Sequence, residues 1–131
     1  MTIHLINPAD LPVPESYTQV AVATGSRMVF VAGQVANDVE GNLVGPGDLA
    51  TQARHAFANV GRALAAAGAR PDQVARITIY VVQYKPEYLP ALSEARMAVF
   101  GDHKPADTLL GVEALAHPAF LIEVEAIAVL E

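Results

Sequence analysis

The sequence predicts an α+β domain in which two helices cover one face of a mixed β-sheet. Three stretches indicate this fold: an apolar stripe at helical spacing over residues 49–67, a β-branched run over residues 76–84, and an apolar closing segment over residues 122–130. Hydrophobic residues make up 53% of the 131 residues and charged residues 17%, which is typical of a folded chain. Residues 1–131 are therefore expected to form a single domain.

The first part of the chain is predicted to contain a β-hairpin. Residues 1–16 include Pro8, Pro12 and Pro14, so this stretch is expected to be extended and irregular. Residues 17–23 and 28–35 are apolar and rich in β-branched side chains, and the turn-forming residues 24–26 lie between them. This pattern favours two strands that pair directly with each other.

Two helices and three further strands are predicted after a turn-rich loop. Asp48 is a suitable N-cap for the first helix, and Gly68 is a suitable residue to end it. The second helix is expected to begin at Pro86 and to end near Phe100, before Gly101. Strands over residues 76–84, 107–112 and 120–130 complete the order β-β-α-β-α-β-β.

Right-handed crossovers place both helices on the same face of such a sheet, which leaves the other face uncovered. In the last strand, apolar side chains point to both faces, although Glu123 and Glu125 interrupt one of them. A strand that is apolar on both faces needs a second covering layer. The sequence therefore predicts a closed homo-oligomer.

Composition excludes several classes of function. The formal net charge is -6, which argues against binding to nucleic acid, because that affinity depends on lysine and arginine. The chain has no cysteine, its four histidines lack the spacing of metal ligands, and no motif for a cofactor is present. No signal peptide or membrane span is visible, so we expect a cytoplasmic protein without a membrane partner or a metal.

Two features of the residue pattern indicate a site for chemistry. Glu123 and Glu125 share one face of an apolar strand, where burial would tune a carboxylate for acid–base work. From the strand alone, the simpler explanation is a solvated crevice or an ion pair with a neighbouring chain. Arg96 falls within the apolar sector of the second helix, and Ser93 lies one turn before it. Its guanidinium either binds an anionic ligand or reaches the surface while its stem covers the core.

Three segments resemble the RidA family of the Rid superfamily, the reactive-intermediate imine deaminases that are also labelled L-PSP endoribonucleases. They are VFVAGQV at residues 29–35, QAR with NV within residues 52–60, and IEVEAIAV at residues 122–129. The resemblance implies a chorismate-mutase-like fold and a homotrimer whose sheets pack inward. It also implies small-molecule clefts between the subunits.

The resemblance further implies an activity and a set of site residues. Well-studied members hydrolyse 2-imino and enamine acids to 2-oxo acids and ammonia, without a cofactor. By position, Tyr17 matches a tyrosine of the cleft, and Gly33 matches a glycine whose backbone lies against the substrate. Glu125 matches the glutamate that orients or activates the hydrolytic water, and Ser93 replaces an asparagine.

One motif departs from the family pattern. Active deaminases have Pro-Ala-Arg at the start of the penultimate strand, and the arginine binds the substrate carboxylate. Here the sequence is Pro-Ala-Asp-Thr, which places Asp107 and Thr108 at the corresponding end of the cleft. An aspartate repels a carboxylate, so the chain resembles an arginine-lacking branch of the superfamily.

The sequence allows two replacements for the missing contact between an arginine and the substrate carboxylate. Arg96 would bind the carboxylate from the second helix, or Asp107 and Glu125 would bind a neutral or cationic ligand instead. Asp107 as a turn-capping residue at the strand entry explains its presence equally well. The main hypothesis is thus a hydrolase of the imine or enamine deaminase type with a changed substrate. The alternative is a non-catalytic protein that binds a small metabolite or a partner, and a ribonuclease is disfavoured by the acidic charge.

Overall fold

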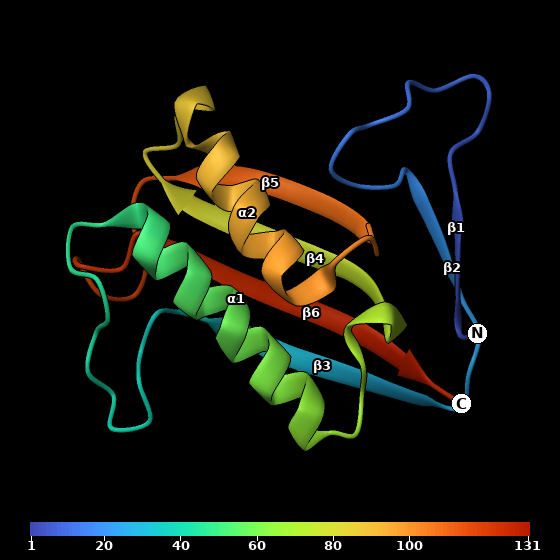
Figure 1. Cartoon of the computed structure of the whole chain (residues 1–131), viewed down its shortest axis with the longest axis horizontal. Helices are drawn as coiled ribbons and strands as arrows, with labels where there is room; N and C mark the ends of the chain where they lie inside the picture. The colour runs from blue at the N-terminus through green and yellow to red at the C-terminus, as the bar shows by residue number, and fades with distance from the viewer.

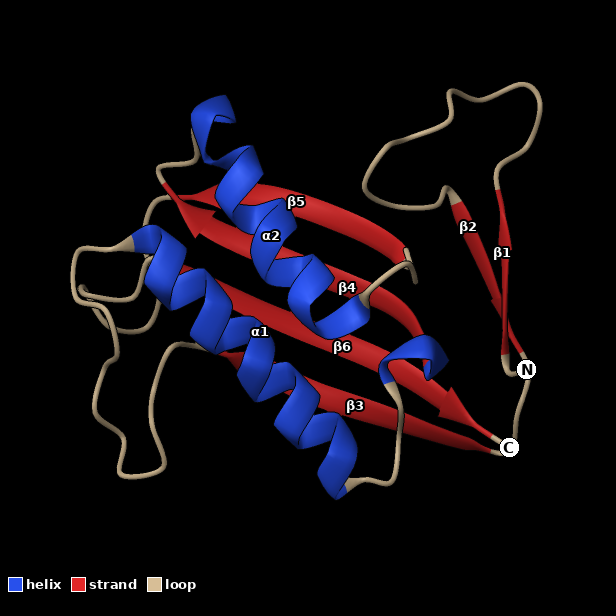
Figure 2. Ribbon diagram, viewed as in Figure 1, coloured by secondary structure: helices blue, strands red, loops and turns tan.

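The computed structural model describes residues 1–131 and shows two layers, with helices packed in front of a sheet (Figure 1). Figure 2 separates the helices from the strands by colour. The helices are α1 (Leu49–Ala66) and α2 (Leu89–Phe100). The short 3-10 turn η1 (Pro71–Gln73) lies between α1 and the next strand, and η2 (Pro86–Tyr88) directly precedes α2. The strands are β1 (Ile3–Ile6), β2 (Val20–Ala23), β3 (Arg27–Gln34), β4 (Val74–Val82), β5 (Ala106–Val112) and β6 (Ile122–Leu130).

The main sheet has four strands in the order β3-β6-β4-β5. Strands β4 and β5 run parallel, and β6 is antiparallel to both of its neighbours, so the sheet is mixed as predicted. Both helices lie on the same face of this sheet (Figure 1). The predicted α+β class with two helices on one face is confirmed.

The helix ends follow the predicted capping residues. The Asp48 side chain accepts a hydrogen bond from the backbone N–H of Thr51 at 3.3 Å, so it caps α1. Gly68 follows this helix with a φ of +75°, a conformation that strongly favours glycine. At α2, Pro86 begins a 3-10 turn, and the α-helix itself starts at Leu89.

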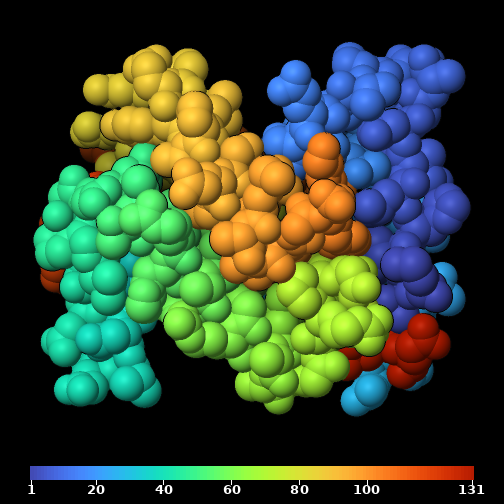
Figure 3. Space-filling view, in the orientation of Figure 1, coloured from blue at the N-terminus to red at the C-terminus, as the bar shows by residue number.

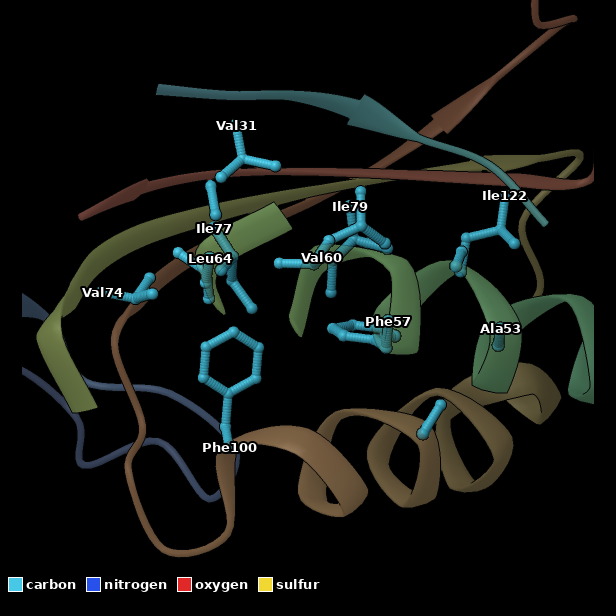
Figure 4. Close-up of a cluster of buried hydrophobic side chains, with 14 of the residues drawn as sticks. Val31, Ala53, Phe57, Val60, Leu64, Val74, Ile77, Ile79, Phe100 and Ile122 are labelled. Carbon is cyan, nitrogen blue, oxygen red and sulfur yellow. The ribbon is translucent and has the colours of Figure 1, made fainter. Parts of the chain in front are cut away.

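The core lies between the helices and the sheet (Figure 4). Phe57 of α1 is fully buried, and its ring meets that of Phe100 edge to face with centroids 6.4 Å apart. Leu64 of α1 and Ile77 of β4 are also fully buried. The apolar stripe of α1 and the inward positions of the strands therefore form one continuous core.

The predicted hairpin over residues 17–35 is wrong. Strand β2 pairs with β1 in a separate two-stranded sheet, whereas β3 pairs with β6. The turn residues 24–26 instead cross the end of β6, where the Ser26 N–H donates to the Leu130 carbonyl at 2.9 Å. Residues 3–6 lie in the stretch predicted to be irregular, but they form a strand that pairs with β2. Strand β3 pairs with β6, which is longer than β2. Figure 1 shows the β1–β2 pair standing beside the main sheet.

The sheet face opposite the helices is not covered by any element of the main layer (Figure 2). Met28 and Phe30 of β3 lie on this face and are 60% and 69% exposed. Ile127 of β6 lies opposite Phe30 in the register and is partly buried. The uncovered face predicted from the sequence is therefore present, with an apolar flank along β3.

Candidate functional site

One cavity lies on the helix side of the sheet, between α2, β5 and the chain before β2. Its volume is about 250 Å³, and most of its wall is apolar, from Ile79, Leu89, Leu92 and Leu109. Figure 3 shows the surface hollowed between the N-terminal segment, in blue, and α2, in gold to orange. The polar groups at the cavity are Ser16, Tyr17, Ser93, Arg96 and Asp107.

Arg96 and Asp107 face this cavity as a separated pair of opposite charges. Arg96 is only 4% exposed, so its side chain does not reach the surface as one interpretation of the sequence expected. Its Nη1 and the Oδ1 of Asp107 are both buried without a hydrogen-bond partner. No nitrogen of Arg96 lies within 4.0 Å of the Asp107 carboxylate, so the two groups form no ion pair.

Burial dominates the electrostatics of this pair. It raises the pKa of Asp107 to about 6, although the charges of Arg96 and Arg76 oppose the rise. Burial also lowers the pKa of Arg96, and the charge of Asp107 partly offsets that effect. Both groups thus lack the solvation that they would have in water, and both would gain from a polar ligand.

A second group of predicted residues lies on the uncovered face of the sheet. A Cβ atom on Gly33 would collide with the side chain of Glu123, so the backbone of β3 and this carboxylate are in direct contact. Glu125 accepts a hydrogen bond from the Tyr80 hydroxyl, which raises the pKa of Tyr80, as do burial and the charge of Glu125. The carboxylate that touches Gly33 is therefore Glu123, and the one held by a tyrosine is Glu125.

Thr108 lies on the same uncovered face, although it follows Asp107 directly. Its hydroxyl accepts a hydrogen bond from Arg76 of β4 at 2.6 Å. Successive side chains of a strand point to opposite faces, so Asp107 and Thr108 cannot both line one side of the sheet. The pair Arg76 and Thr108 lies near Glu125, which shares a small cavity with Arg76 and Thr78.

The structure thus divides the predicted site into two halves within one chain. Tyr17, Ser93, Arg96 and Asp107 meet at the cavity on the helix side. Gly33, Glu125 and Thr108 lie at the uncovered face or at its edge, across the sheet from that cavity. Sequence reasoning missed Tyr80, although the alternation of Arg76, Thr78 and Tyr80 with buried isoleucines and a valine signals a polar face on β4.

A wider groove of about 580 Å³ adjoins Gly33, beside the loop between β3 and α1. The Asn59 side chain holds this loop by donating to the carbonyls of Val35 and Asn37, both at 2.9 Å. The His55 ring contacts the same Asn37 carbonyl at 3.0 Å, so it helps to hold this loop in place. No three side chains of the histidine and carboxylate types lie close enough together to hold a metal ion.

Neither helix has both the length and the apolar character needed to cross a lipid bilayer.

The two glycine contacts give a matched pair of variants. We expect Gly33→Ala to change the free energy of unfolding by less than about 1 kcal/mol, because the flexible Glu123 side chain can move away. Gly25→Ala is expected to cost about 2 kcal/mol or more, because its Cβ would meet the backbone carbonyl of Leu130. Urea denaturation of both variants measures the difference. Equal losses would show that Glu123 is held rigidly against Gly33.

Comparison with known proteins identifies relatives over nearly the whole chain. The family model described as Endoribonuclease L-PSP matches residues 9–130. A RutC family protein from Pyrococcus abyssi is 33% identical over 112 residues, which cover 86% of this chain and 84% of that one. A 2-iminobutanoate/2-iminopropanoate deaminase from Dermatophagoides farinae is 30% identical over 115 residues, which cover 88% and 86%.

A solved structure agrees with this assignment. The crystal structure of a Yersinia pestis protein of the conserved Rid family has a TM-score of 0.93 and 38% identity, with 99% of this chain and 100% of that chain covered. That protein is described as a member of the Rid family, which the motifs at residues 29–35 and 122–129 resemble. The chain therefore belongs to the Endoribonuclease L-PSP family, within the Rid superfamily.

Proposed function

We propose that this protein is a homotrimer that hydrolyses an imine or enamine C–N bond of a small metabolite in clefts between its subunits. The division of the site into two halves supports this proposal more than any other observation. The carboxylates Glu123 and Glu125 lie across the sheet from the cavity at Arg96 and Asp107, so a ligand that meets both halves must contact two chains. The exposed apolar flank at Met28 and Phe30 gives the second chain a surface to cover.

The residues present can perform such a hydrolysis. A carboxylate takes a proton from water as the oxygen attacks the imine carbon, and the nitrogen gains a proton from a nearby donor. The resulting carbinolamine then loses ammonia as its C–N bond breaks and a carbonyl forms. The overall change adds one water and releases one ammonia, and it needs no oxidant or cofactor.

Two glutamates are candidates for the carboxylate that orients the water. The family resemblance assigns this role to Glu125, which the Tyr80 hydroxyl holds in place. The geometry favours Glu123, because this side chain touches the backbone of Gly33, where the resemblance places the substrate. We propose Glu123 as the water-orienting group and Glu125 as a positioning residue that fixes the charge beside it.

Asp107 supports a substrate other than a 2-imino acid. The deaminase from Dermatophagoides farinae has a name that specifies two imino acids, and both of these are anions at neutral pH. In this chain a carboxylate would meet the Asp107 carboxyl as well as the Arg96 guanidinium. We therefore propose that the protein represents an arginine-lacking branch, which accepts an uncharged imine better than an anionic one.

A trapping assay tests this proposal. 2-Iminobutanoate is generated in situ from 2-aminobutanoate and O₂ by an amino-acid oxidase, with catalase to remove the H₂O₂. Its uncharged methyl ester is generated by base-promoted loss of HCl from methyl N-chloro-2-aminobutanoate, and semicarbazide traps the imine that remains. We expect the protein to lower semicarbazone formation from the ester, and to act at least about 10-fold more weakly on the acid. Glu123→Gln should abolish the effect on the ester, whereas Glu125→Gln should weaken it and shift its pH profile.

Two results would contradict the hydrolase. If neither imine is consumed faster, the protein is better described by the alternative, a metabolite-binding trimer that lacks the chemistry. If the acid is the better substrate, Arg96 replaces the missing arginine, and Arg96→Met should then abolish turnover. Loss of activity only in Glu125→Gln, with Glu123→Gln active, would return the water-orienting role to Glu125.

A further inference from the structure

The cavity between α2 and β5 is lined by two side chains that each carry a buried polar atom without a hydrogen-bond partner. The donor is Nη1 of Arg96, on a side chain that is 4% exposed, and the acceptor is Oδ1 of Asp107. The two groups line the cavity together without forming an ion pair within 4.0 Å. Buried polar groups without partners are costly, so a group that hydrogen-bonds to both atoms would be stabilised here.

We propose that the cavity binds an uncharged carboxamide, whose carbonyl oxygen accepts from Arg96 Nη1 and whose NH₂ group donates to Asp107 Oδ1. The inference rests on the proposed function, because it names the group that replaces the substrate carboxylate in the same cleft. A primary amide places its acceptor and its donor side by side on one carbon. It therefore satisfies both buried atoms with a single small group.

Singly charged groups fit this pair less well. A carboxylate satisfies Arg96 but has no proton to offer Asp107, so two negative charges would share a poorly solvated space. An ammonium group satisfies Asp107 and meets the Arg96 guanidinium with the same difficulty. Only a group with both a donor and an acceptor leaves neither buried atom unpaired.

A zwitterionic amino acid also has both charges, but its needs exceed what the cavity offers. An ammonium has three donors and a carboxylate has two acceptor oxygens. The two buried atoms without partners are one donor and one acceptor, and most of the cavity wall is apolar, as at Leu92 and Leu109. Full charges without enough partners are penalised heavily in such surroundings, whereas a neutral amide loses much less on desolvation.

The size and access of the cavity suit a small ligand. Its volume is about 250 Å³. Sites for drug-sized molecules are larger, with volumes of about 300–1,000 Å³. An outer groove of about 430 Å³ shares Ser16, Leu89, Ser93 and Arg96 with it. The ligand can therefore enter through this groove, with its amide end at Arg96 and Asp107.

Titration with four probes of similar shape tests the inference. The probes are isobutyramide, isobutyrate, isobutylamine and 2-aminoisobutyrate, which are neutral, anionic, cationic and zwitterionic at pH 7.5. Binding to the full-length protein is followed by NMR, and contact is located from the shifts of backbone amides around Ser93 and Asp107. We expect isobutyramide to bind at least about 10-fold more tightly than each of the other three.

Two variants should change this preference in a predictable way. In Asp107→Asn the new amide can donate, so isobutyrate should bind at least about 10-fold more tightly than it binds the wild type. Arg96→Met keeps an apolar stem of similar length and should remove the binding of both isobutyramide and isobutyrate. The matched controls are Asp72→Asn and Arg70→Met, because these residues form an exposed ion pair of 3.0 Å outside the cavity. Both controls should keep the wild-type preference.

Several outcomes would overturn the inference, and they separate it from the proposed function. Tighter binding of any charged or zwitterionic probe, or no binding of any probe, would show that the pair does not recognise an amide. The binding measurement needs no turnover and uses a cavity lined by one chain, so it stands apart from hydrolysis. Glu123→Gln should keep the amide preference even though the hydrolase proposal expects it to be inactive.

Discussion

Phe30→Glu is expected to convert the proposed trimer into monomers at micromolar concentration. Phe30 is 69% exposed on the sheet face that lies opposite the helices, and Met28 extends the apolar surface beside it. Covering a phenylalanine contributes about 1.5–3 kcal/mol, and burying an unpaired carboxylate in its place adds a further cost. A loss of about 3 kcal/mol at each interface weakens association by about 100-fold or more.

Light scattering coupled to size-exclusion chromatography measures this change. Met97→Glu is the matched control, because Met97 is 53% exposed on α2, in the helix layer, and should leave the trimer intact. Phe30→Glu should also lose hydrolysis while it keeps the amide preference of the cavity at Arg96. A wild-type monomer would refute the trimer, and an intact trimer in Phe30→Glu would place the interface on another surface.

Asp107→Asn is expected to stabilise the protein at neutral pH and to have little effect near pH 4. Burial raises the pKa of Asp107 from the ordinary 3.8 to about 6, so the folded protein binds this proton more tightly than the unfolded chain does. The contribution of Asp107 to stability therefore improves as the pH falls from about 7 to about 4, and it is least favourable above pH 6. Asparagine avoids this penalty at every pH.

The difference between a pKa of about 6 and one of 3.8 corresponds to at most about 3 kcal/mol. Urea denaturation of the wild type and of Asp107→Asn between pH 4 and 8 gives the free energy of unfolding of each protein at each pH. The gap between the two curves of free energy against pH measures this penalty. The charged groups that act on Asp107 are Arg96 from α2 and Arg76 from the neighbouring β4, and both already oppose the rise. Asp72→Asn, at an exposed carboxylate, should show no such gap. Parallel curves for the wild type and Asp107→Asn would mean that Asp107 is solvated in solution.

The sequence determined most of the main layer because its signals are local. The capping residues Asp48 and Gly68 set the ends of α1, and alternation along β4 and β6 assigned each side chain to a face. The hairpin over residues 17–35 could not be predicted correctly, because a turn sequence does not specify which strand its neighbours will pair with. That choice depends on the long-range contact of β3 with β6, which lies almost a hundred residues away.

The candidate site, like the fold, was predictable from the sequence only in part. Residue types and motifs identified Tyr17, Arg96, Asp107 and the two glutamates as the groups to examine. They could not show that Arg96 is buried with an unpartnered nitrogen, because helical periodicity places a residue on a face without fixing the path of a long side chain. Nor could they show that Glu123, rather than Glu125, touches Gly33, because this contact depends on the register between β3 and β6.

The sequence by itself thus determined the fold class, the family and the side chains available for chemistry, since these depend on local periodicity and on motifs. The tertiary structure alone decided that the site has two halves on opposite sides of the sheet, with Asp107 facing the helices and Thr108 facing away. The physical reason is the alternation of a strand combined with long-range pairing: adjacent residues are sent to opposite faces, and distant strands decide what each face meets.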